Sequence, residues 1–270
     1  MREAIRNRLG ALAAILLFVQ PVVVRAEADA AVPRSALPQS LDRGAVVLSF
    51  DDRNFDDWLK ALPLMAKYGA RATFFVSGNI DGQTLDAVRQ LHSHGHAIGA
   101  HGIHHLRAVE YSQQRSVDEY LQNEVLPQVE QLKVAGITPT AFAYPNSRNN
   151  EATDAALLKV FRHLRTGCSV AAGEQVSGKH ALFVPADQVS SRGCLCGKGI
   201  DFAPERADRT YEQIDGALTR AAQNREVLVL YAHGIASSGK GNHITPEALE
   251  RVLWKTKELG LAFYTFDQLP

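Results

Sequence analysis

The chain has 270 residues, and 46% of them are apolar, which is enough for one ordinary domain with a substantial core or for one α/β barrel. Lysine and arginine together number 29, as do aspartate and glutamate, and the sequence has no basic tail or stripe. This balance argues against a nucleic-acid partner. Six of the ten histidines lie within residues 92–105, which makes that segment the first place to look for a functional site.

The N-terminus has the features of a secretory signal peptide. Arginines at positions 2, 6 and 8 precede an apolar stretch over residues 9–24, and Val24 and Ala26 suit the −3 and −1 positions of a cleavage site. The stretch is short for a membrane span, which needs about 20 apolar residues. We therefore expect a signal peptide at residues 1–26 that is cleaved rather than kept as an anchor. The mature protein would then have no stable membrane insertion and would be periplasmic or secreted.

Beyond a linker expected at residues 27–43, one domain is expected over residues 44–270, where short apolar runs alternate with helix-like segments. We expect strands at 45–50, 72–76, 97–100, 141–144, 227–232 and 262–266, and helices at 55–68, 83–94, 117–135, 150–161, 211–223 and 245–259. This alternation predicts an α/β fold with a mostly parallel sheet, either a barrel or a doubly wound sheet. Because reactive side chains of such folds lie at the C-terminal ends of strands, the residues after each strand are the main candidates.

Two aspartates, Asp51 and Asp52, directly follow the first strand. Adjacent side chains on an extended chain point in opposite directions. One carboxylate could therefore bind a metal ion while the other faces a substrate as a base. Aspartate is also common at loop starts and helix caps, so the pair carries little weight alone.

Two histidines, His101 and His105, follow the third strand at a spacing of four residues. On a helical turn this spacing puts both imidazoles on one face, which is a frequent way to present two nitrogen ligands to zinc or another divalent ion. With a carboxylate from another strand end they would form an open site with room for water. His92, His94 and His96 precede the strand and are better explained as surface or helix-end residues.

Two further strands end in residues of interest. His233 follows the apolar run VLVLYA, and the turn Tyr144-Pro145-Asn146 follows the run AFA. A histidine in this position is equally compatible with a structural role near the core. The convergence of four strand ends on titratable or rigid groups is much more informative than any one of them.

Three cysteines, Cys168, Cys194 and Cys196, are compatible with export without proving it. A disulfide from Cys168 to either Cys194 or Cys196 is favoured over the strained Cys-x-Cys pair. A zinc site is the weaker alternative, because no second closely spaced cysteine pair exists.

Four motifs give the chain a resemblance to the polysaccharide deacetylase family, also called the NodB-homology domain or carbohydrate esterase family 4. They are SFDD, HGIHH, FAYP and LVLYAH, which begin at Ser49, His101, Phe142 and Leu228. They occur in the family's order, and the resemblance covers roughly residues 44–269. It implies a single domain with a distorted (β/α) barrel of the NodB-homology type and a divalent metal ion. Zinc is the first choice, and cobalt, nickel and iron are alternatives.

The resemblance also implies a role for each motif residue. Asp52, His101 and His105 resemble the family's metal ligands. Asp51 resembles the general base, and His233 resembles the general acid. The implied reaction is hydrolytic removal of N-acetyl groups from N-acetylglucosamine-containing envelope or extracellular polysaccharide. An O-acetyl esterase of the xylan type, a catalytically silent glycan-binding domain and a periplasmic metal-binding protein are alternatives. The oligomeric state is left open.

The resemblance further implies which residues contact the substrate. Leu228 and Leu230 would lie on the strand that lines the pocket for the acetyl methyl group. The backbone N–H of Tyr144 would face the oxyanion, and Pro145 would wall the same pocket.

Two elements of the family pattern are missing. Ala143 stands where the family commonly has an arginine that orients the catalytic aspartate, and Arg53 or Arg192 are candidate replacements. The Asp-Trp element that steadies the catalytic histidine also has no evident counterpart, and Asp187 or Asp201 are candidates for that role.

Overall fold

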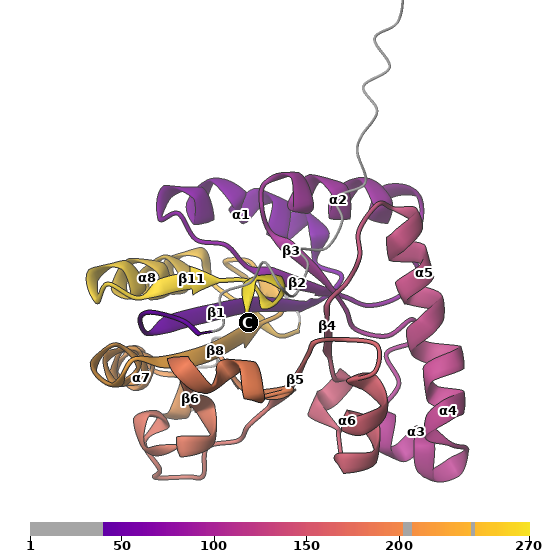
Figure 1. Cartoon of the computed structure of the whole chain (residues 1–270). Coiled ribbons are helices and arrows are strands. Elements are labelled where there is room, and N and C mark those ends of the chain that lie inside the picture. Colours follow the sequence, from indigo (N-terminus) through magenta and orange to yellow (C-terminus); the bar gives the residue numbers. More distant parts are fainter. Residues whose placement is uncertain (1–39, 202–206, 239–240) are drawn as a thin grey trace, which may run out of the picture.

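Seven parallel strands form a closed barrel in the described part of the chain, which comprises residues 40–201, 207–238 and 241–270 of this computed structural model (Figure 1). Their order is β1-β2-β3-β4-β5-β7-β8, and parallel pairing of β1 with β8 closes the ring. These strands are β1 (Ala45–Asp52), β2 (Thr73–Val76), β3 (Ala97–Ala100), β4 (Ala141–Ala143), β5 (His163–Gly167), β7 (Cys194–Gly199) and β8 (Glu226–Ala232). The expected single-domain distorted barrel is thereby confirmed.

Four more short strands lie outside the ring. β11 (Ala262–Tyr264) is parallel to β1, and β6 (Phe183–Pro185) is antiparallel to β8. A separate two-stranded sheet joins β9 (Gly234–Ile235) to β10 (His243–Ile244) directly after β8. β5, β6, β7, β9 and β10 all fall outside the strands expected from the sequence.

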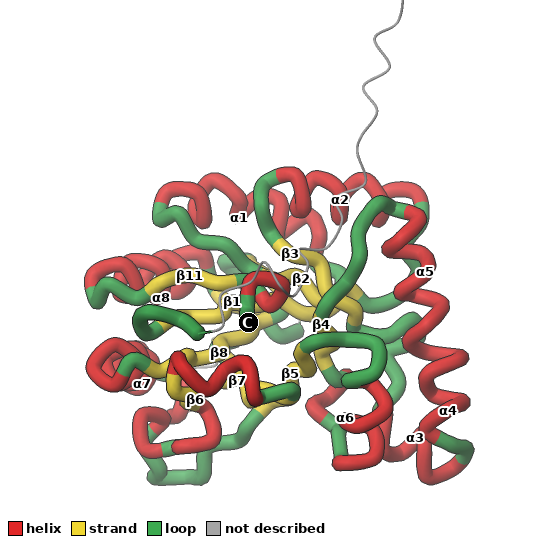
Figure 2. The backbone as a smooth tube through the Cα atoms, in the orientation of Figure 1, coloured by secondary structure: helices red, strands yellow, loops and turns green. Residues whose placement is uncertain are grey.

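Helices surround the strands (Figure 2). They are α1 (Phe55–Lys67), α2 (Gly82–Ser93), α3 (Ala108–Gln114), α4 (Val117–Tyr120), α5 (Leu126–Val134), α6 (Glu151–Leu157), α7 (Tyr211–Asn224) and α8 (Pro246–Glu258). The single helix expected at residues 117–135 is interrupted, because a five-residue π-helical turn, Leu121–Val125, joins α4 to α5.

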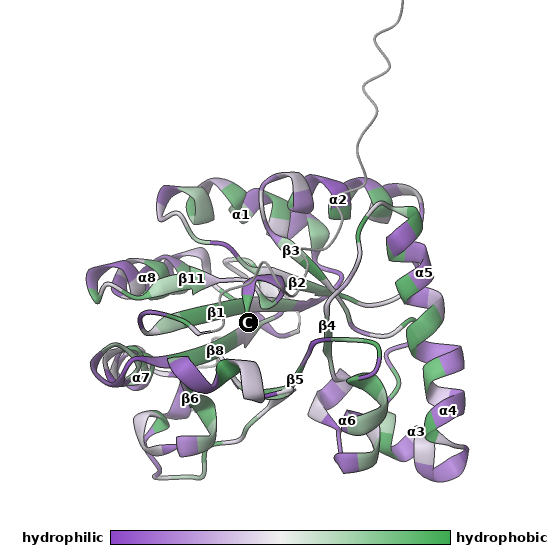
Figure 3. Cartoon of the chain, viewed as in Figure 1, coloured by the Kyte–Doolittle hydropathy of each residue, from purple (hydrophilic) through white to green (hydrophobic). Residues whose placement is uncertain are grey.

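Alternate residues of each strand face two different layers, as the period of two requires. On β1, Val46 and Leu48 pack with helix residues, whereas Ala45 and Val47 belong to a smaller cluster inside the barrel. The central strands are accordingly mostly hydrophobic, while the helices alternate between hydrophobic and hydrophilic residues (Figure 3). Burying each large apolar side chain stabilises the fold by about 1.5–3 kcal/mol.

Helix α1 connects the core to the C-terminal end of β8. Its residues Trp58, Leu62 and Met65 are buried one or two turns apart. The indole N–H of Trp58 donates a hydrogen bond of 2.8 Å to the backbone carbonyl of His233. A buried aromatic anchor therefore determines where the chain leaves the barrel at that point.

The prediction of a signal peptide, and most of the predicted linker, concerns residues 1–39, which lie outside the described residues. Leu41 is already buried, and its N–H donates to the carbonyl oxygen of Ala186. In the described ranges, no helix combines the length and apolar character that crossing a membrane requires.

Candidate active site

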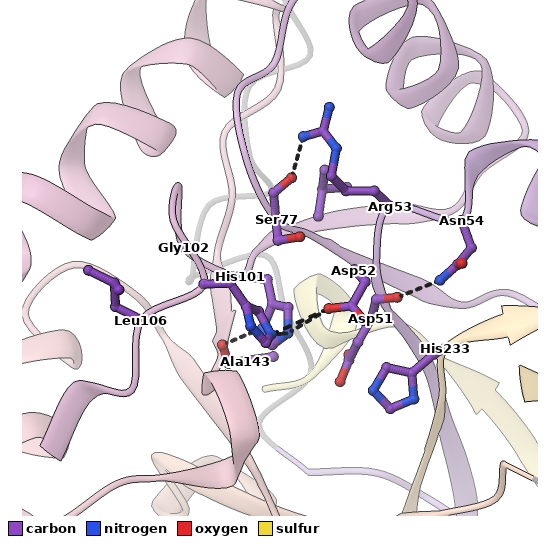
Figure 4. Close-up of polar contacts among 12 residues, drawn as sticks. Asp51, Asp52, Arg53, Asn54, Ser77, His101, Gly102, Leu106, Ala143 and His233 are labelled. Atoms are coloured by element: carbon purple, nitrogen blue, oxygen red, sulfur yellow. Dashed lines mark hydrogen bonds and ion pairs between the residues drawn. The ribbon is translucent and has the colours of Figure 1, made fainter. Parts of the chain in front are cut away.

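Asp52, His101 and His105 come together at the C-terminal ends of β1 and β3. Figure 4 shows Asp52 and His101 pointing toward each other. Asp52 Oδ1 lies 3.6 Å from His101 Nε2 and 3.4 Å from His105 Nε2, and the two Nε2 atoms are 3.2 Å apart. Ligand bonds of 2.0–2.1 Å in tetrahedral geometry would separate the ligand atoms by about 3.3 Å. The three residues therefore fit a divalent ion of the size of zinc.

The surroundings of these residues favour metal binding as well. The Nδ1 atom of His101 lies 2.8 Å from the carbonyl oxygen of Ala143, so Nδ1 carries the proton and Nε2 keeps its lone pair for a metal. Burial raises the pKa of Asp52, but hydrogen bonding to His101 and the charges of His101, His233 and His105 outweigh this effect and lower the pKa to about 2. Burial, followed by the charge of His101, lowers the pKa of His105. The trio thus favours an ionised carboxylate and a neutral His105.

Asp51 is buried and faces the barrel interior, and Arg165 of β5 forms an ion pair with its Oδ2 atom. Its other oxygen, Oδ1, is also buried and has no hydrogen-bond partner among the described residues. Arg53 instead donates to the carbonyl oxygens of Ser77 and Asn79, and so it is not the partner of Asp51. One carboxylate oxygen is therefore held in place while the other remains available.

Two aromatic rings pack against Arg165, and a glycine on the neighbouring strand leaves room for its side chain. Its guanidinium carbon lies 4.5 Å from the ring centre of Tyr231 and 5.5 Å from that of Phe75. Gly197 of β7 faces the same space, because a Cβ there would lie 3.0 Å from the Tyr231 ring and 3.2 Å from Arg165 Cδ. Arg165 is not among the site residues predicted from the sequence. The nearest signal in the sequence was an arginine within the run HLRTG, which reads as too polar for a core strand.

His233 pairs with Asp201, one of the two candidates considered from the sequence. Nδ1 of His233 lies 2.7 Å from Asp201 Oδ2, and the His233 N–H donates to Asp201 Oδ1 at 2.9 Å. Burial lowers the pKa of His233, but hydrogen bonding to Asp201 and the charges of Asp201, Asp51 and Asp52 raise it above its usual value. Because Nδ1 faces Asp201, Nε2 is the ring nitrogen available to a substrate.

The expectations for Tyr144, Leu228 and Leu230 do not agree with the structure. The Tyr144 N–H donates to the carbonyl oxygen of Arg165 at 2.9 Å within the sheet, and its hydroxyl donates to Asp154 at 2.7 Å. Neither donor is therefore available to an oxyanion. Leu228 and Leu230 are fully buried in the cluster shared with the helices, because the alternation along β8 directs them away from the barrel interior.

A polar cleft of about 390 Å³ is lined in part by Tyr231 and by Arg209, whose guanidinium donates a hydrogen bond to the carbonyl oxygen of Asp201. Asn146 from the turn that Pro145 begins, Cys168 and Tyr231 contribute to its walls. The ring centres of Tyr231 and His233 are 6.1 Å apart, so the cleft adjoins the candidate site. A larger groove of about 830 Å³ along α1 and α2 is lined by none of the predicted catalytic, metal-binding or substrate-binding residues.

A disulfide links Cys168, which follows β5 and lines this cleft, to Cys196 of β7. The strand register decides between the two pairings left open by the sequence. The Cys168 N–H donates to the carbonyl oxygen of Gly197, beside Cys196, whereas Cys194 lies two residues earlier on β7, opposite Leu164. Cys194 is free, and burial raises the pKa of its thiol to about 12.

Known proteins share part of this sequence. Residues 39–160 match the model of the family described as polysaccharide deacetylase. A chitin deacetylase of Colletotrichum lindemuthianum is 34% identical over 92 residues, which cover 30% of this chain and 37% of that protein. The chain spans less than half of the length of the curated relatives that it matches.

Solved structures share the fold over most of the chain. The peptidoglycan deacetylase PdaC from Bacillus subtilis has a TM-score of 0.53 and 19% identity, covering 84% of this chain and 90% of that one. A family 4 acetyl xylan esterase from Clostridium thermocellum, in complex with a cobalt ion, has a TM-score of 0.55 and 21% identity, covering 83% and 89%. Residues 39–160 are thus similar in sequence to the polysaccharide deacetylase family, and the domain as a whole shares the fold of these solved structures.

Proposed function

We propose that this protein is a metal-dependent hydrolase that removes N-acetyl groups from N-acetylglucosamine-containing polysaccharide. The observation that carries this proposal is the buried Oδ1 atom of Asp51, which has no hydrogen-bond partner in the described part of the chain. The same site also holds the Asp52, His101 and His105 trio and His233. Amide hydrolysis needs a base for water, an electrophile for the carbonyl and an acid for the leaving amine. The site offers residues suited to all three tasks.

Asp52, His101 and His105 would hold the ion, with zinc as the first choice and cobalt, nickel or iron as alternatives. When bound, a divalent ion polarises a carbonyl group and lowers the pKa of water. Of the chain's own residues, Asp51 would take the proton of the attacking water on Oδ1 while Arg165 holds Oδ2.

His233 would donate the second proton. Its Nδ1 atom faces Asp201, so Nε2 would protonate the departing amine of the sugar. The raised pKa of His233 keeps the imidazolium form available for this step at near-neutral pH. The adjoining polar cleft, walled by Tyr231 and by the turn that begins at Pro145, would receive a neighbouring sugar unit.

The experiment is acetate release from N-acetylglucosamine oligomers by the purified protein, with added zinc or cobalt and with a chelator. Release that needs the metal and is abolished by Asp51→Asn would support the proposal. The matched control is Asp118→Asn, which neutralises an exposed carboxylate on α4 and should leave activity unchanged. Stoichiometric metal binding without release from N- or O-acetylated glycans would overturn the enzymatic proposal and favour a glycan-binding domain.

An O-acetyl esterase is the second candidate, because the acetyl xylan esterase of Clostridium thermocellum has the same fold. The same base and ion would serve ester cleavage, whose alcohol leaving group depends less on a proton from His233. Acetylated xylan in a parallel assay separates the two candidates. A much higher kcat/KM on xylan than on the amino-sugar oligomers would replace N-deacetylation with this alternative.

We also propose that the protein acts outside the cytoplasm, in the periplasm or as a secreted protein. The relatives named for chitin and peptidoglycan support this location, since these polymers are extracytoplasmic. Mass spectrometry of the protein from its host would test it. A mature N-terminus after Ala26 is expected, and an intact N-terminus on a cytoplasmic protein would refute it.

A further inference from the structure

The loop that carries both candidate histidine ligands has an unusual backbone. It connects β3 to α3, and two of its residues, Gly102 and His105, have positive φ angles of 83° and 58°. A left-handed conformation at a residue other than glycine costs of order 1–3 kcal/mol and persists only where the surroundings impose it. Something outside the loop must therefore hold it.

Gln128 of α5 is the first of two buried polar side chains that do so. It is 0% exposed, and its Oε1 atom accepts hydrogen bonds from the backbone N–H groups of His101 at 3.0 Å and Gly102 at 2.9 Å. Its Nε2 atom donates to the carbonyl oxygens of Val76, Gly78 and Gly102 at 2.9–3.1 Å. One amide thus ties the start of the histidine loop to the end of β2.

Glu124 is the second, and it also is 0% exposed. Its carboxylate accepts hydrogen bonds from the backbone N–H groups of His104 at 3.0 and 3.1 Å and of Leu106 at 2.8 Å, and it contacts His104 Nδ1 at 3.0 Å. These donors lie immediately on either side of His105. A Cβ at Gly102 would come within 2.4 Å of Glu124 Oε1, so the carboxylate fills the space of the missing side chain.

The helix that supplies both residues departs from regular α-helix where it meets the loop. Glu124 lies in the π-helical turn Leu121–Val125, and Gln128 follows one turn later on the same side of α5. Single π-helical turns are rare and often occur at functional sites. Burying a carboxylate or an amide costs free energy unless the group is fully hydrogen-bonded, and both of these buried groups form their hydrogen bonds with one loop.

We propose that Glu124 and Gln128 are positioning residues that preorganise His101 and His105 for binding a divalent metal ion. The inference rests on the metal site of the proposed function, but it concerns metal binding and does not depend on which substrate is used. Neither side chain would touch the ion. Each side chain acts through the backbone of the loop. Replacing it would therefore let the two imidazole nitrogens move away from the separation that metal binding requires.

The test is a Co²⁺ titration of the metal-free protein, followed by visible absorption, which reports both affinity and ligand geometry without any substrate. The variants are Gln128→Met, Glu124→Leu and the milder Glu124→Gln, which keeps one acceptor oxygen. We expect Co²⁺ binding to weaken by about 10–100-fold in Gln128→Met and Glu124→Leu, with an altered spectrum, and less in Glu124→Gln.

Gln131→Met is the matched control. Gln131 also lies on α5 and also holds a loop, since it accepts from the Ile80 N–H at 2.8 Å and donates to Asn79 at 3.1 Å, but it does not touch the histidine loop. This variant should lose thermal stability while its Co²⁺ affinity and spectrum stay unchanged. Circular dichroism at the titration temperature identifies any variant that has not folded, and the Glu124→Gln variant keeps the test valid if Glu124→Leu does not fold.

Unchanged Co²⁺ affinity and spectrum in the folded Glu124 and Gln128 variants would overturn the inference while leaving the proposed function intact. An equal loss of affinity in Gln131→Met would also overturn it, because the effect would then follow general stability. A wild-type protein that binds Co²⁺ in the expected way but releases no acetate would instead refute the proposed function alone. A wild-type protein that binds no Co²⁺ would refute both.

Discussion

The buried ion pair between Asp51 and Arg165 permits a quantitative test by a double-mutant cycle. Asp51 is 2% exposed and Arg165 is 1% exposed, so each charge depends on the other for compensation. Removing one member of a buried pair typically costs 3–5 kcal/mol, because the remaining charge stays buried without a partner. We therefore expect Arg165→Met to lower the free energy of unfolding by about 3–5 kcal/mol, a large share of a typical total of 5–15 kcal/mol.

The choice of substitutions isolates the charge from the packing. Methionine keeps much of the apolar bulk that Arg165 places against Tyr231 and Phe75, and Asp51→Asn keeps the shape of the carboxylate. The double variant leaves no unpaired charge at positions 51 and 165. It should consequently be more stable than Arg165→Met alone, although it lacks two native side chains.

Urea unfolding of the four proteins in the presence of a chelator supplies the cycle, because bound metal would add its own stabilisation. Thermal midpoints should follow, at about 2–4 °C for each kcal/mol in a domain of this size. Strictly additive effects, or a loss below about 1 kcal/mol for Arg165→Met, would refute the view that Arg165 compensates the buried charge of Asp51.

Three other perturbations test the site and its surroundings. Asp201→Asn removes the main charge that raises the pKa of His233, so the alkaline limb of the pH profile of kcat/KM should move to lower pH. An alkaline limb at the same pH in this variant would exclude His233 as the general acid. His96 is buried with its pKa lowered to about 4, mainly by burial, so the folded protein takes up this proton only well below pH 6.5. Stability should therefore fall by up to about 3 kcal/mol as pH drops from 6.5 toward 4, and His96→Asn, which can still accept from the Ala72 N–H, should flatten that slope in urea unfolding. A chelator should lower the thermal midpoint of the wild type more than that of His101→Ala, and equal shifts would argue against a metal held by His101.

Local pattern was sufficient to predict most of the barrel. Apolar runs such as 45–50 and 227–232 are buried on both sides, which makes them recognisable without any partner. β5 and β7 were missed for a physical reason. They contain arginine and glycine because their inward side accommodates the Arg165–Tyr231 stack, and Lys198 of β7 forms an ion pair with Asp208. Such strands show no apolar alternation that a sequence pattern could detect.

The site residues likewise divide into those that the sequence predicts and those that only the tertiary structure shows. The sequence alone predicted the strand-end aspartates and the His101/His105 pair, because adjacency and a spacing of four can be seen locally. The helical turn expected from that spacing is wrong, since both histidines belong to a loop between β3 and α3 that contacts with Glu124 and Gln128 hold in place. Only the tertiary structure showed that Arg165 compensates Asp51 across 114 positions, that Asp201 rather than Asp187 pairs with His233, and that Tyr144 has no free N–H. Those contacts depend on strand order and register, which are set by packing and hydrogen bonding between segments far apart in the chain.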